Sequence, residues 1–299
     1  MKIPTWRYLL RKDAKTLVMG IINATPDSFS GDGVYANSGT ISAAVELAEA
    51  QLAAGADILD IGGESTRPGS DAVDANTEKL RILPVIKEIA GQHPDAVLSV
   101  DTYRAEVAAA ALDCGANLIN DVWAAQADPE MAPLMAERGV PVILMHNRSR
   151  PNAVLSKERV GAEYIGAEYS HIVDDISAEL SQVVDKLTDA KVSRRQIALD
   201  PGIGFGKSVD QNLALLKNLD KLKRRLNLPF VLGTSRKSFI GRILDLPIEE
   251  RLEGTAATVA AGIKKGAGII RVHDVREMVR VARVIDRLKV VPPSGKVGG

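Results

Sequence analysis

Three stretches of this chain share one pattern, in which a Gly-Ala pair closes an alanine-rich segment and a short apolar run follows. The stretches begin at Gly55, Gly115 and Gly266. The polar residues that end them, five positions after each glycine, are Asp60, Asn120 and Arg271. A glycine in this place is typical of a left-handed helix cap, and the apolar run is typical of a buried strand. We therefore predict repeated βα units around a parallel sheet.

The same logic extends the sheet to eight strands. A looser copy of the pattern starts at Gly139 and ends at His146. Four further apolar runs complete the set, at 17–22, 96–100, 196–199 and 229–232. The helical segments between the strands are predicted at 41–54, 77–90, 104–113, 129–138, 163–188, 210–225, 251–265 and 275–288. Eight strands and eight helices in about 250 residues predict an α/β fold, the (β/α)8 TIM barrel.

One barrel accounts for most of the chain as a single domain. We expect residues 1–16 to form an N-terminal extension, residues 17–290 the barrel, and residues 291–299 a flexible tail. Residues 146–162 are predicted to be a long surface loop after the fifth strand. A doubly wound sheet is the alternative fold, but no glycine-rich dinucleotide fingerprint follows the first strand.

Composition argues against several classes of function. Lys+Arg and Asp+Glu balance at 38 each, so no overall field would attract a nucleic acid or an anionic membrane. Aromatic residues make up 4% of the chain, which is too few for a nucleic-acid stacking platform. The single cysteine, Cys114, allows no internal disulfide. Because the sequence also has neither a signal-like N-terminal run nor a membrane-spanning one, we expect a cytoplasmic protein.

Polar residues end nearly all of the predicted strands, where a TIM barrel carries its active site. They are Asn23, Asp60, Asp101, Asn120, His146, Asp200, Ser235, Arg271 and His273. A buried polar group is costly unless it is paired, so this many on one face predict a site. For Asp60 and Asp121 a salt bridge or a structural role is the simpler interpretation, and we leave both out of the predicted site.

The residues at this face sort into two chemical sets. A set with both hydrogen-bond donors and carboxylate acceptors suits a flat heterocycle; its members are Asp101, Asn120, Asp200 and Lys237. A neutral or cationic set suits a phosphate, with or without Mg²⁺; its members are Asn23, Thr66, Arg67, Arg271 and His273. Ser238 starts a predicted short helix and could add backbone N–H groups for an anion.

Three other kinds of site fail on the residues present. The segment 202–208 resembles a P-loop, but Pro201 occupies a position where that motif needs glycine. No HExxH sequence or His/Cys cluster supports a zinc site. His146 and His273 have no nearby serine or cysteine placed as a nucleophile, so acyl transfer is not expected.

Six motifs and a closing segment follow one another along residues 17–275. They are NATPDSFS (23–30), DIGGESTRPG (60–69), SVDTYRAEVA (99–108), IND (119–121), DPGIGFGK (200–207), GTSRKSFIG (233–241) and RVHDV (271–275). Together they resemble dihydropteroate synthase, a family of pterin-binding TIM-barrel enzymes of folate biosynthesis. The resemblance implies a transferase that joins 6-hydroxymethyl-7,8-dihydropterin diphosphate to 4-aminobenzoate, giving 7,8-dihydropteroate and diphosphate. It also implies a sulfonamide target and a homodimer formed through helices of the C-terminal half.

The resemblance carries roles onto individual residues. For the pterin it implies Asp101, Asn120, Asp200 and Lys237, with Met145 packing nearby. For the diphosphate it implies Thr66, Arg271 and His273, with Asn23 as a ligand of Mg²⁺. For 4-aminobenzoate it implies Phe29, Arg67, Pro68, Phe205, Lys237 and Ser238. Catalysis would depend on Asp101, Asp200, Lys237, Arg271 and His273.

The implied reaction needs no nucleophile from the protein. Diphosphate leaves once its charge is neutralised, and the carboxylates of Asp101 and Asp200 favour the cation left on the pterin. The arylamine then attacks, a step that needs positioning more than a strong base. The residues at 30–33 and 147–150 depart from the common family pattern, so contacts made there are not carried over.

Two alternative functions use a similar barrel. A pterin-dependent methyltransferase would have little use for Arg67, Arg271 and His273, because its pterin carries no diphosphate. A catalytically inactive pterin-binding barrel would be expected to have lost part of the anion set, which is intact here. The expected partners are small-molecule substrates and a second copy of the chain, with no nucleic acid and no membrane.

Overall fold

The structure is a computed structural model that describes residues 6–11, 13–25, 38–64, 73–148, 154–156, 163–164 and 168–291. Its centre is a sheet of eight parallel strands. They are β1 (Leu17–Asn23), β2 (Ile58–Gly62), β3 (Leu98–Asp101), β4 (Leu118–Asp121), β5 (Val142–Met145), β8 (Ile197–Asp200), β9 (Val231–Leu232) and β10 (Ile269–Val272). The strand order is β8-β5-β4-β3-β2-β1-β10-β9, and a parallel bridge between Leu199 and Phe230 brings the two edges together. The sheet thus closes into the predicted TIM barrel.

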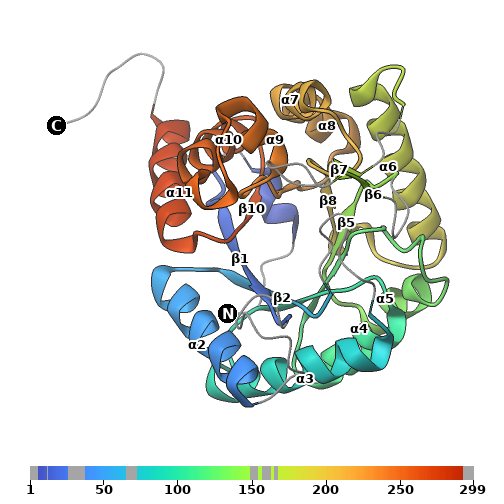
Figure 1. Ribbon diagram of the computed structural model, residues 1–299. Coiled ribbons are helices and arrows are strands. Elements are labelled where there is room, and N and C mark those ends of the chain that lie inside the picture. The colour runs from blue at the N-terminus through green and yellow to red at the C-terminus, as the bar shows by residue number, and fades with distance from the viewer. Residues whose placement is uncertain are drawn as a thin grey trace.

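Helices surround the strands, as Figure 1 shows. They are α2 (Ser38–Ala54), α3 (Ala75–Gln92), α4 (Ala105–Asp113), α5 (Met131–Arg138), α6 (Ile172–Asp189), α7 (Val209–Lys217), α8 (Leu219–Leu226), α9 (Ser238–Leu244), α10 (Leu252–Lys264) and α11 (Val275–Val290). Shorter 3-10 turns are η1 (Trp6–Leu10), η2 (Arg194–Gln196) and η3 (Ile248–Glu250). None of the helices in the described part of the chain is long and apolar enough to cross a membrane.

The glycines that defined the repeat end helices as predicted. Gly55, Gly115 and Gly266 have φ angles of +100°, +115° and +102°, a region that side chains with a Cβ rarely adopt. Gly139 caps α5 with φ +63°, so the looser copy of the pattern follows the same geometry. A strand begins within a few residues of each cap, which explains why this short sequence pattern identified the barrel strands.

Two predicted helices have different limits in the structure. The helix expected at 163–188 begins only at Ile172, and residues 163–164 instead form β7, which pairs antiparallel with β6 (Val154–Ser156). The helix expected at 210–225 is broken at Asn218 into α7 and α8. Asn218 has φ −113° and its side-chain amide donates to the Ala214 carbonyl, a local bond that competes with a continuing helix.

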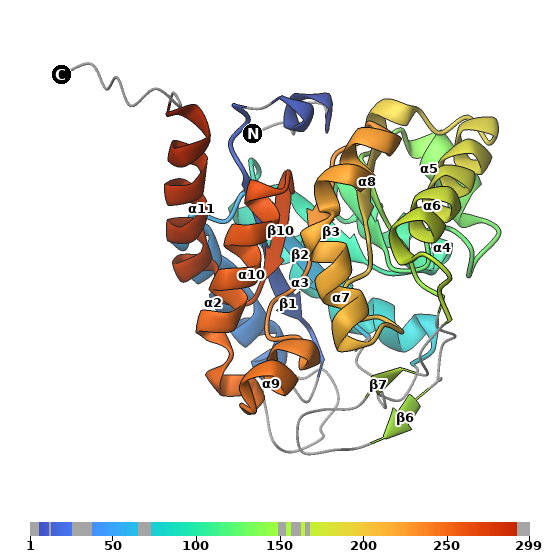
Figure 2. The same ribbon diagram turned by 90° about the horizontal axis from the view of Figure 1, so that it is seen from above.

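The N-terminal 3-10 turn packs against one end of the barrel. Trp6 and Leu9 of η1 are each only 2% exposed, and they join a core cluster of inward-facing strand residues. Figure 2 shows this turn beside the N-terminus at one end of the molecule, with β6, β7 and α9 at the other end. The carboxyl ends of the strands lie toward that second end. The predicted C-terminal tail, beyond residue 291, lies outside the described residues.

The sheet register places several polar residues at the same level. Asn23 pairs with Gly62, Gly62 with Asp101, and Asp101 with Asn120, across β1, β2, β3 and β4. These residues end their strands or lie one position from the end. The hydrogen-bond ladder of the barrel therefore gathers three of the predicted site residues at one mouth.

Candidate active site

Arg271 lies at the centre of a buried polar cluster at this mouth. Its Nε atom donates to Asp60 Oδ2 at 2.6 Å, and its Nη2 atom donates to Asp101 Oδ2 at 2.6 Å. The Asn120 side-chain amide donates to the same Asp60 oxygen at 3.1 Å. The four residues come from β10, β2, β3 and β4, so closure of the barrel is what brings them together.

Burial changes the proton affinity of the carboxyl groups in the mouth. Burial raises the pKa of Asp101 to about 7, although the Arg271 guanidinium acts in the opposite direction. Burial likewise raises the pKa of Asp200, which accepts a hydrogen bond from the Gly202 N–H at 2.7 Å. For Arg271, burial acts to lower the pKa, but the carboxylates of Asp60 and Asp101 outweigh it and the pKa is raised. The guanidinium therefore stays charged, while the acids hold their protons more tightly than exposed acids do.

Asp60 is part of the candidate site, although the sequence analysis left it out. The salt bridge that we expected for Asp60 is present, but its partner is Arg271, a predicted site residue. Asp60 is fully buried, and its Oδ1 atom has no hydrogen-bond partner among the described residues. It was excluded because a single carboxylate at a strand end has no sequence signal that distinguishes support of the site from an ordinary ion pair. Asp121, also excluded, is structural: it accepts from the backbone N–H groups of Trp123 and Ala125.

The loop after β8 brings Phe205 to Lys237. The Lys237 Nζ atom lies 4.0 Å from the centroid of the Phe205 ring, within cation–π range. Gly204 between them has φ +84°, and a Cβ added there would lie 2.8 Å from Lys237 Cδ. Glycine is thus needed at 204 both for the backbone angle and for the space that the lysine side chain takes.

Lys207 holds the same loop from inside. Its buried ammonium group donates to the carbonyls of Gly202 and Phe205 at 2.8 and 3.0 Å. Burial lowers the pKa of Lys207 to about 7, even though the Asp200 carboxylate acts to raise it. The segment that resembled a P-loop is therefore a glycine-rich turn folded around its own lysine, and it positions Phe205 rather than a phosphate.

An apolar wall borders the polar cluster. Met145 and Phe205 pack with Val122 in one buried group, against Tyr103 and Trp123. The Tyr103 and Trp123 rings meet edge to face with their centroids 4.7 Å apart. A flat ring system bound at this mouth would have hydrogen-bonding groups on its edges and apolar surface beside it.

The other predicted residues are distributed around the mouth. Asn23 ends β1 and is half-buried, Ser238 begins α9, and His273 follows β10 with its ring nitrogen Nδ1 at 3.0 Å from Ser235 Oγ. Four predicted residues lie outside the described part of the chain: Phe29, Thr66, Arg67 and Pro68.

His146, directly after β5, pairs with a residue of α6. Its Nε2 atom lies 2.9 Å from Glu179 Oε2 of α6, and burial lowers the pKa of the imidazole. Arg148 pairs with the same glutamate. The hydrogen bond with His146 is the largest cause that lowers the pKa of Glu179 to about 2, and Arg148 lowers it further. His146, together with Arg148 from the segment 147–150 that departs from the family pattern, thus connects the end of β5 to α6.

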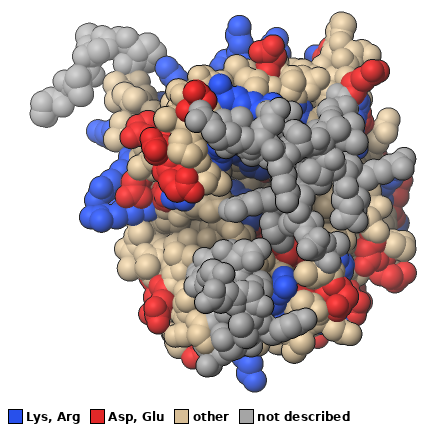
Figure 3. All heavy atoms as spheres, viewed as in Figure 1, with Lys and Arg blue, Asp and Glu red and all other residues tan. Residues whose placement is uncertain are grey.

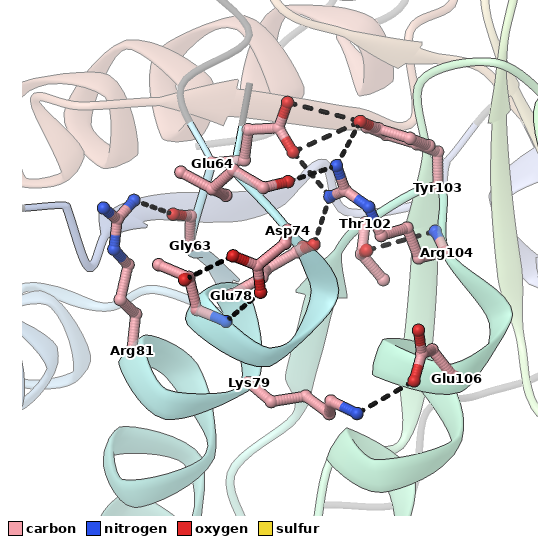
Figure 4. Close-up of polar contacts among 12 residues, drawn as sticks. Gly63, Glu64, Asp74, Glu78, Lys79, Arg81, Thr102, Tyr103, Arg104 and Glu106 are labelled. Atoms are coloured by element: carbon pink, nitrogen blue, oxygen red, sulfur yellow. Dashed lines mark hydrogen bonds and ion pairs between the residues drawn. The ribbon is translucent and has the colours of Figure 1, made fainter. Parts of the chain in front are cut away.

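A second charged cluster lies beside the mouth and was not predicted. Arg104, just before α4, contacts the carboxylates of Glu64 and Glu78, and its Nη2 atom donates to the Val73 carbonyl at 2.6 Å (Figure 4). Tyr103 Oη is a further contact of both Arg104 and Glu64. Arg104 thereby ties the end of β2 to the beginning of α3. The only sequence signal was the presence of Glu64 and Arg104 inside two motifs, which does not reveal that they pair.

Comparison with known proteins identifies the family. A family model described as pterin binding enzyme matches residues 19–273. A dihydropteroate synthase of Bacillus subtilis is 45% identical over 274 residues, which are 92% of this chain and 89% of that protein. The chain belongs to the dihydropteroate synthase family.

Solved structures of dihydropteroate synthases agree with this membership. The enzyme of Clostridium difficile, in the presence of pteroic acid, superposes with a TM-score of 0.83 at 40% identity over 92% of this chain and 97% of that one. The enzyme of Xanthomonas albilineans, with 4-aminobenzoic acid, gives a TM-score of 0.83 at 37% identity over 94% and 95%. The predicted TIM barrel and family resemblance are confirmed, and the chain is a transferase enzyme of folate biosynthesis.

Proposed function

We propose that the barrel mouth joins 6-hydroxymethyl-7,8-dihydropterin diphosphate to 4-aminobenzoate, with release of diphosphate. The observation that carries this assignment is the buried cluster in which Arg271 meets Asp60 and Asp101, with Asn120 on the same carboxylate. A half-buried guanidinium between two carboxylates leaves their remaining lone pairs for donors on a ligand. Family membership supplies the ligand whose edges fit them.

The pterin is recognised by the carboxylates and amides of the mouth. Asp101 and Asp200 accept from the N–H and NH₂ groups of the ring, and Asn120 can both donate and accept. Lys237, above the Phe205 ring, donates to a carbonyl or ring nitrogen of the pterin. Met145 packs beside the ring as part of the apolar wall.

The diphosphate and 4-aminobenzoate bind toward the outside of the mouth. Arg271 in β10 and His273 directly after it hold the diphosphate together with Thr66. Ser238 at the start of α9 and Phe205 contribute to the 4-aminobenzoate pocket, with Phe29, Arg67 and Pro68 from the segments outside the described residues. Sulfonamides, which copy 4-aminobenzoate, compete for that pocket.

Asn23 fits a Mg²⁺ ion that is held mainly by the substrate. The described residues contain no group of three or more His, Cys, Asp or Glu side chains that could hold a metal ion. Asn23 offers one half-buried amide oxygen at the end of β1. Mg²⁺ usually keeps several waters and takes further oxygens from substrate phosphates, so a single protein ligand suffices. When bound, the ion adds positive charge at the leaving diphosphate.

The chain's own residues then act by charge and position. The C–O bond to diphosphate breaks with its electron pair on the leaving oxygen, which Arg271 and His273 stabilise. The cation left on the pterin lies near Asp101 and Asp200. The amine nitrogen of 4-aminobenzoate forms the C–N bond with its lone pair and loses a proton to diphosphate or solvent.

We also infer a homodimer and a cytoplasmic location. On α11, Val284 and Leu288 lie four residues apart and are 61% and 62% exposed, which supports an apolar contact through this C-terminal helix. The face drawn in Figure 3 carries lysine and arginine interspersed with aspartate and glutamate, so it offers no single-sign surface for a nucleic acid. Cys114 is a free thiol, as suits a reducing compartment.

The test is a coupled assay with purified protein, Mg²⁺, the dihydropterin diphosphate and labelled 4-aminobenzoate. We expect labelled dihydropteroate from the parent chain and a loss of at least about a hundredfold in Lys237→Ala and Asn23→Ala. Arg138→Ala serves as the control, because the ion pair of Arg138 with Asp113 joins the carboxyl ends of α5 and α4, at the opposite end of the barrel from the mouth. Pterin binding without product in the parent would contradict the synthase assignment and favour the inactive pterin binder.

A further inference from the structure

Ser235 and His273 are joined by two hydrogen bonds at the ends of neighbouring strands. The His273 backbone N–H donates to Ser235 Oγ at 3.1 Å, and the same oxygen lies 3.0 Å from the Nδ1 atom of the His273 ring. Ser235 is only 5% exposed, so water does not readily replace either contact. One hydroxyl therefore contacts both the backbone and the ring of the histidine.

The residues that follow Ser235 and His273 in the chain fix the position of this pair. Arg236 Nε donates to Asp274 Oδ2 at 3.0 Å, and a second guanidinium nitrogen of Arg236 contacts the other oxygen of Asp274. The Arg236 backbone N–H donates to Thr255 Oγ1 at 3.0 Å. Two adjacent contacts, 235 with 273 and 236 with 274, therefore join the chain segments that follow β9 and β10.

The hydrogen bonds of the serine determine which ring nitrogen of a neutral His273 carries the proton. A hydroxyl has one hydrogen and two lone pairs, and the His273 backbone N–H occupies one of those lone pairs. The Ser235 hydroxyl needs an acceptor for its own hydrogen, and among the described residues that acceptor is His273 Nδ1. If Nδ1 carried a proton, the ring and the hydroxyl would both be donors, and the buried serine hydrogen would have no acceptor.

We propose that Ser235 is a positioning residue that keeps neutral His273 in the tautomer with its proton on Nε2. The ring then presents an N–H donor on the side away from Ser235, where an anion can accept it. That the anion is the diphosphate of the substrate rests on the proposed function. The positive charge of Arg271 is already shared between Asp60 and Asp101, so a neutral donor of fixed direction adds recognition that the arginine alone does not supply.

The direct test is ¹⁵N NMR of the histidine ring nitrogens in the full-length chain. The chain has four histidines, and His273→Gln identifies the signals of residue 273 by their loss. We expect a pyridine-type shift for Nδ1 and a pyrrole-type shift for Nε2 in the parent. Ser235→Ala should mix the two tautomers, and Ser235→Thr, which keeps a hydroxyl, should restore the parent pattern. A parent spectrum with the proton on Nδ1 overturns the proposal, and so does a Ser235→Ala spectrum identical to that of the parent.

Kinetics give a second readout that a merely structural role would not reproduce. In Ser235→Ala the KM for the dihydropterin diphosphate should rise about tenfold, as for loss of one hydrogen bond, while the KM for 4-aminobenzoate stays the same. Ser177→Ala removes a buried hydroxyl on α6 and is the matched control. An equal rise in both KM values would overturn the proposal. The NMR spectrum of the parent chain and its binding of inorganic diphosphate can both be measured even if the chain forms no dihydropteroate. Failure of the proposed function can therefore be distinguished from failure of the tautomer proposal.

Discussion

Arg271 and Asp60 are 211 positions apart in the chain, yet their side chains meet at 2.6 Å in the mouth of the barrel. The contact crosses from β10 to β2, the two strands that flank β1 in the sheet. It places a permanent positive charge beside Asp101 and Asn120. Arg271, which the sequence analysis assigned to the anion set, therefore contacts the set assigned to the heterocycle. The pterin site and the anion site therefore share Arg271 and are not two independent halves.

Removal of Asp60 should destabilise the fold as well as the site. Asp60→Ala leaves Arg271 with Asp101 as its carboxylate partner in this cluster and removes the acceptor of the Asn120 amide. We expect the free energy of unfolding, measured by urea denaturation, to fall by about 3 kcal/mol. Asp113→Ala breaks an exposed pair with Arg138 and should cost less than about 1 kcal/mol. Equal small losses in the two variants would contradict a structural role for the Arg271–Asp60 pair.

The activity should rise with pH through the titration of Asp101. Its carboxylate is the form that accepts from the pterin and favours the cation, and burial raises its pKa to about 7. We expect kcat/KM for the dihydropterin diphosphate to increase from about pH 5 to a plateau above about pH 8. Asp101→Asn should be much less active, and its kcat/KM should lose the part of the rise with pH that is due to Asp101. If kcat/KM of that variant rose with pH as it does in the parent, the titration would belong to another group, such as the substrate phosphates.

Stability should change with pH in the opposite direction. The pKa of Asp101 in the folded chain, about 7, is above the usual value of 3.8, so the folded chain binds this proton more tightly than the unfolded chain. The contribution of Asp101 is therefore fully present below the unfolded pKa and is lost as pH rises through the folded pKa. Urea midpoints of the parent should fall relative to those of Asp101→Asn between about pH 4 and pH 7. If the difference between the two urea midpoints did not change with pH, Asp101 would not hold its proton more tightly in the folded chain.

Gly204 can be tested against a glycine that shares its backbone conformation. Gly204→Ala meets Lys237 Cδ at 2.8 Å, whereas Gly139→Ala, at φ +63°, has no atom within 4 Å of the new Cβ. Both changes strain the backbone and should cost about 1 kcal/mol or more in stability. Only Gly204→Ala should displace Lys237 and raise the KM for the pterin substrate, by about tenfold. Similar kinetics in the two variants would mean that the Gly204–Lys237 contact does not position the lysine.

Arg104 should be essential to the second charged cluster. In Arg104→Met the carboxylate of Glu78, whose side chain is 1% exposed, loses its cationic partner (Figure 4). We expect a loss of about 3 kcal/mol in unfolding free energy, with partial recovery in the double variant Arg104→Met/Glu78→Gln. Lys79→Met, which breaks a nearby but exposed pair, provides the comparison. Additive effects of the Arg104 and Glu78 changes would argue against direct coupling.

The barrel was predictable because its signals are local. The glycines at 55, 115 and 266 each mark a helix end within a few residues of a strand, and the structure has the same left-handed caps. The four apolar runs predicted with bounds, 17–22, 96–100, 196–199 and 229–232, agree with β1, β3, β8 and β9 to within two residues at either end. Helix limits failed where a local bond decided them, as at Asn218, whose side chain bonds the Ala214 carbonyl.

The pairing inside the site was less predictable, because it depends on closure of the barrel. Asp60 looked like an ordinary ion-pair partner until Arg271 was placed beside it. Arg104 and Glu64 lay in two separate motifs, and only the fold brings them together. Trp6 belongs to a segment expected to lie outside the barrel, but it is buried against the inward-facing ends of the strands.

Condensation at the barrel mouth is tested by the stoichiometry of the two products, diphosphate and dihydropteroate. Purified parent chain is incubated with Mg²⁺, the dihydropterin diphosphate and 4-aminobenzoate, and diphosphate and dihydropteroate are quantified together. We expect equal amounts of both, with diphosphate release that depends on 4-aminobenzoate. Diphosphate released without 4-aminobenzoate and without a C–N product would contradict it, because the barrel mouth would then be catalysing hydrolysis and not condensation.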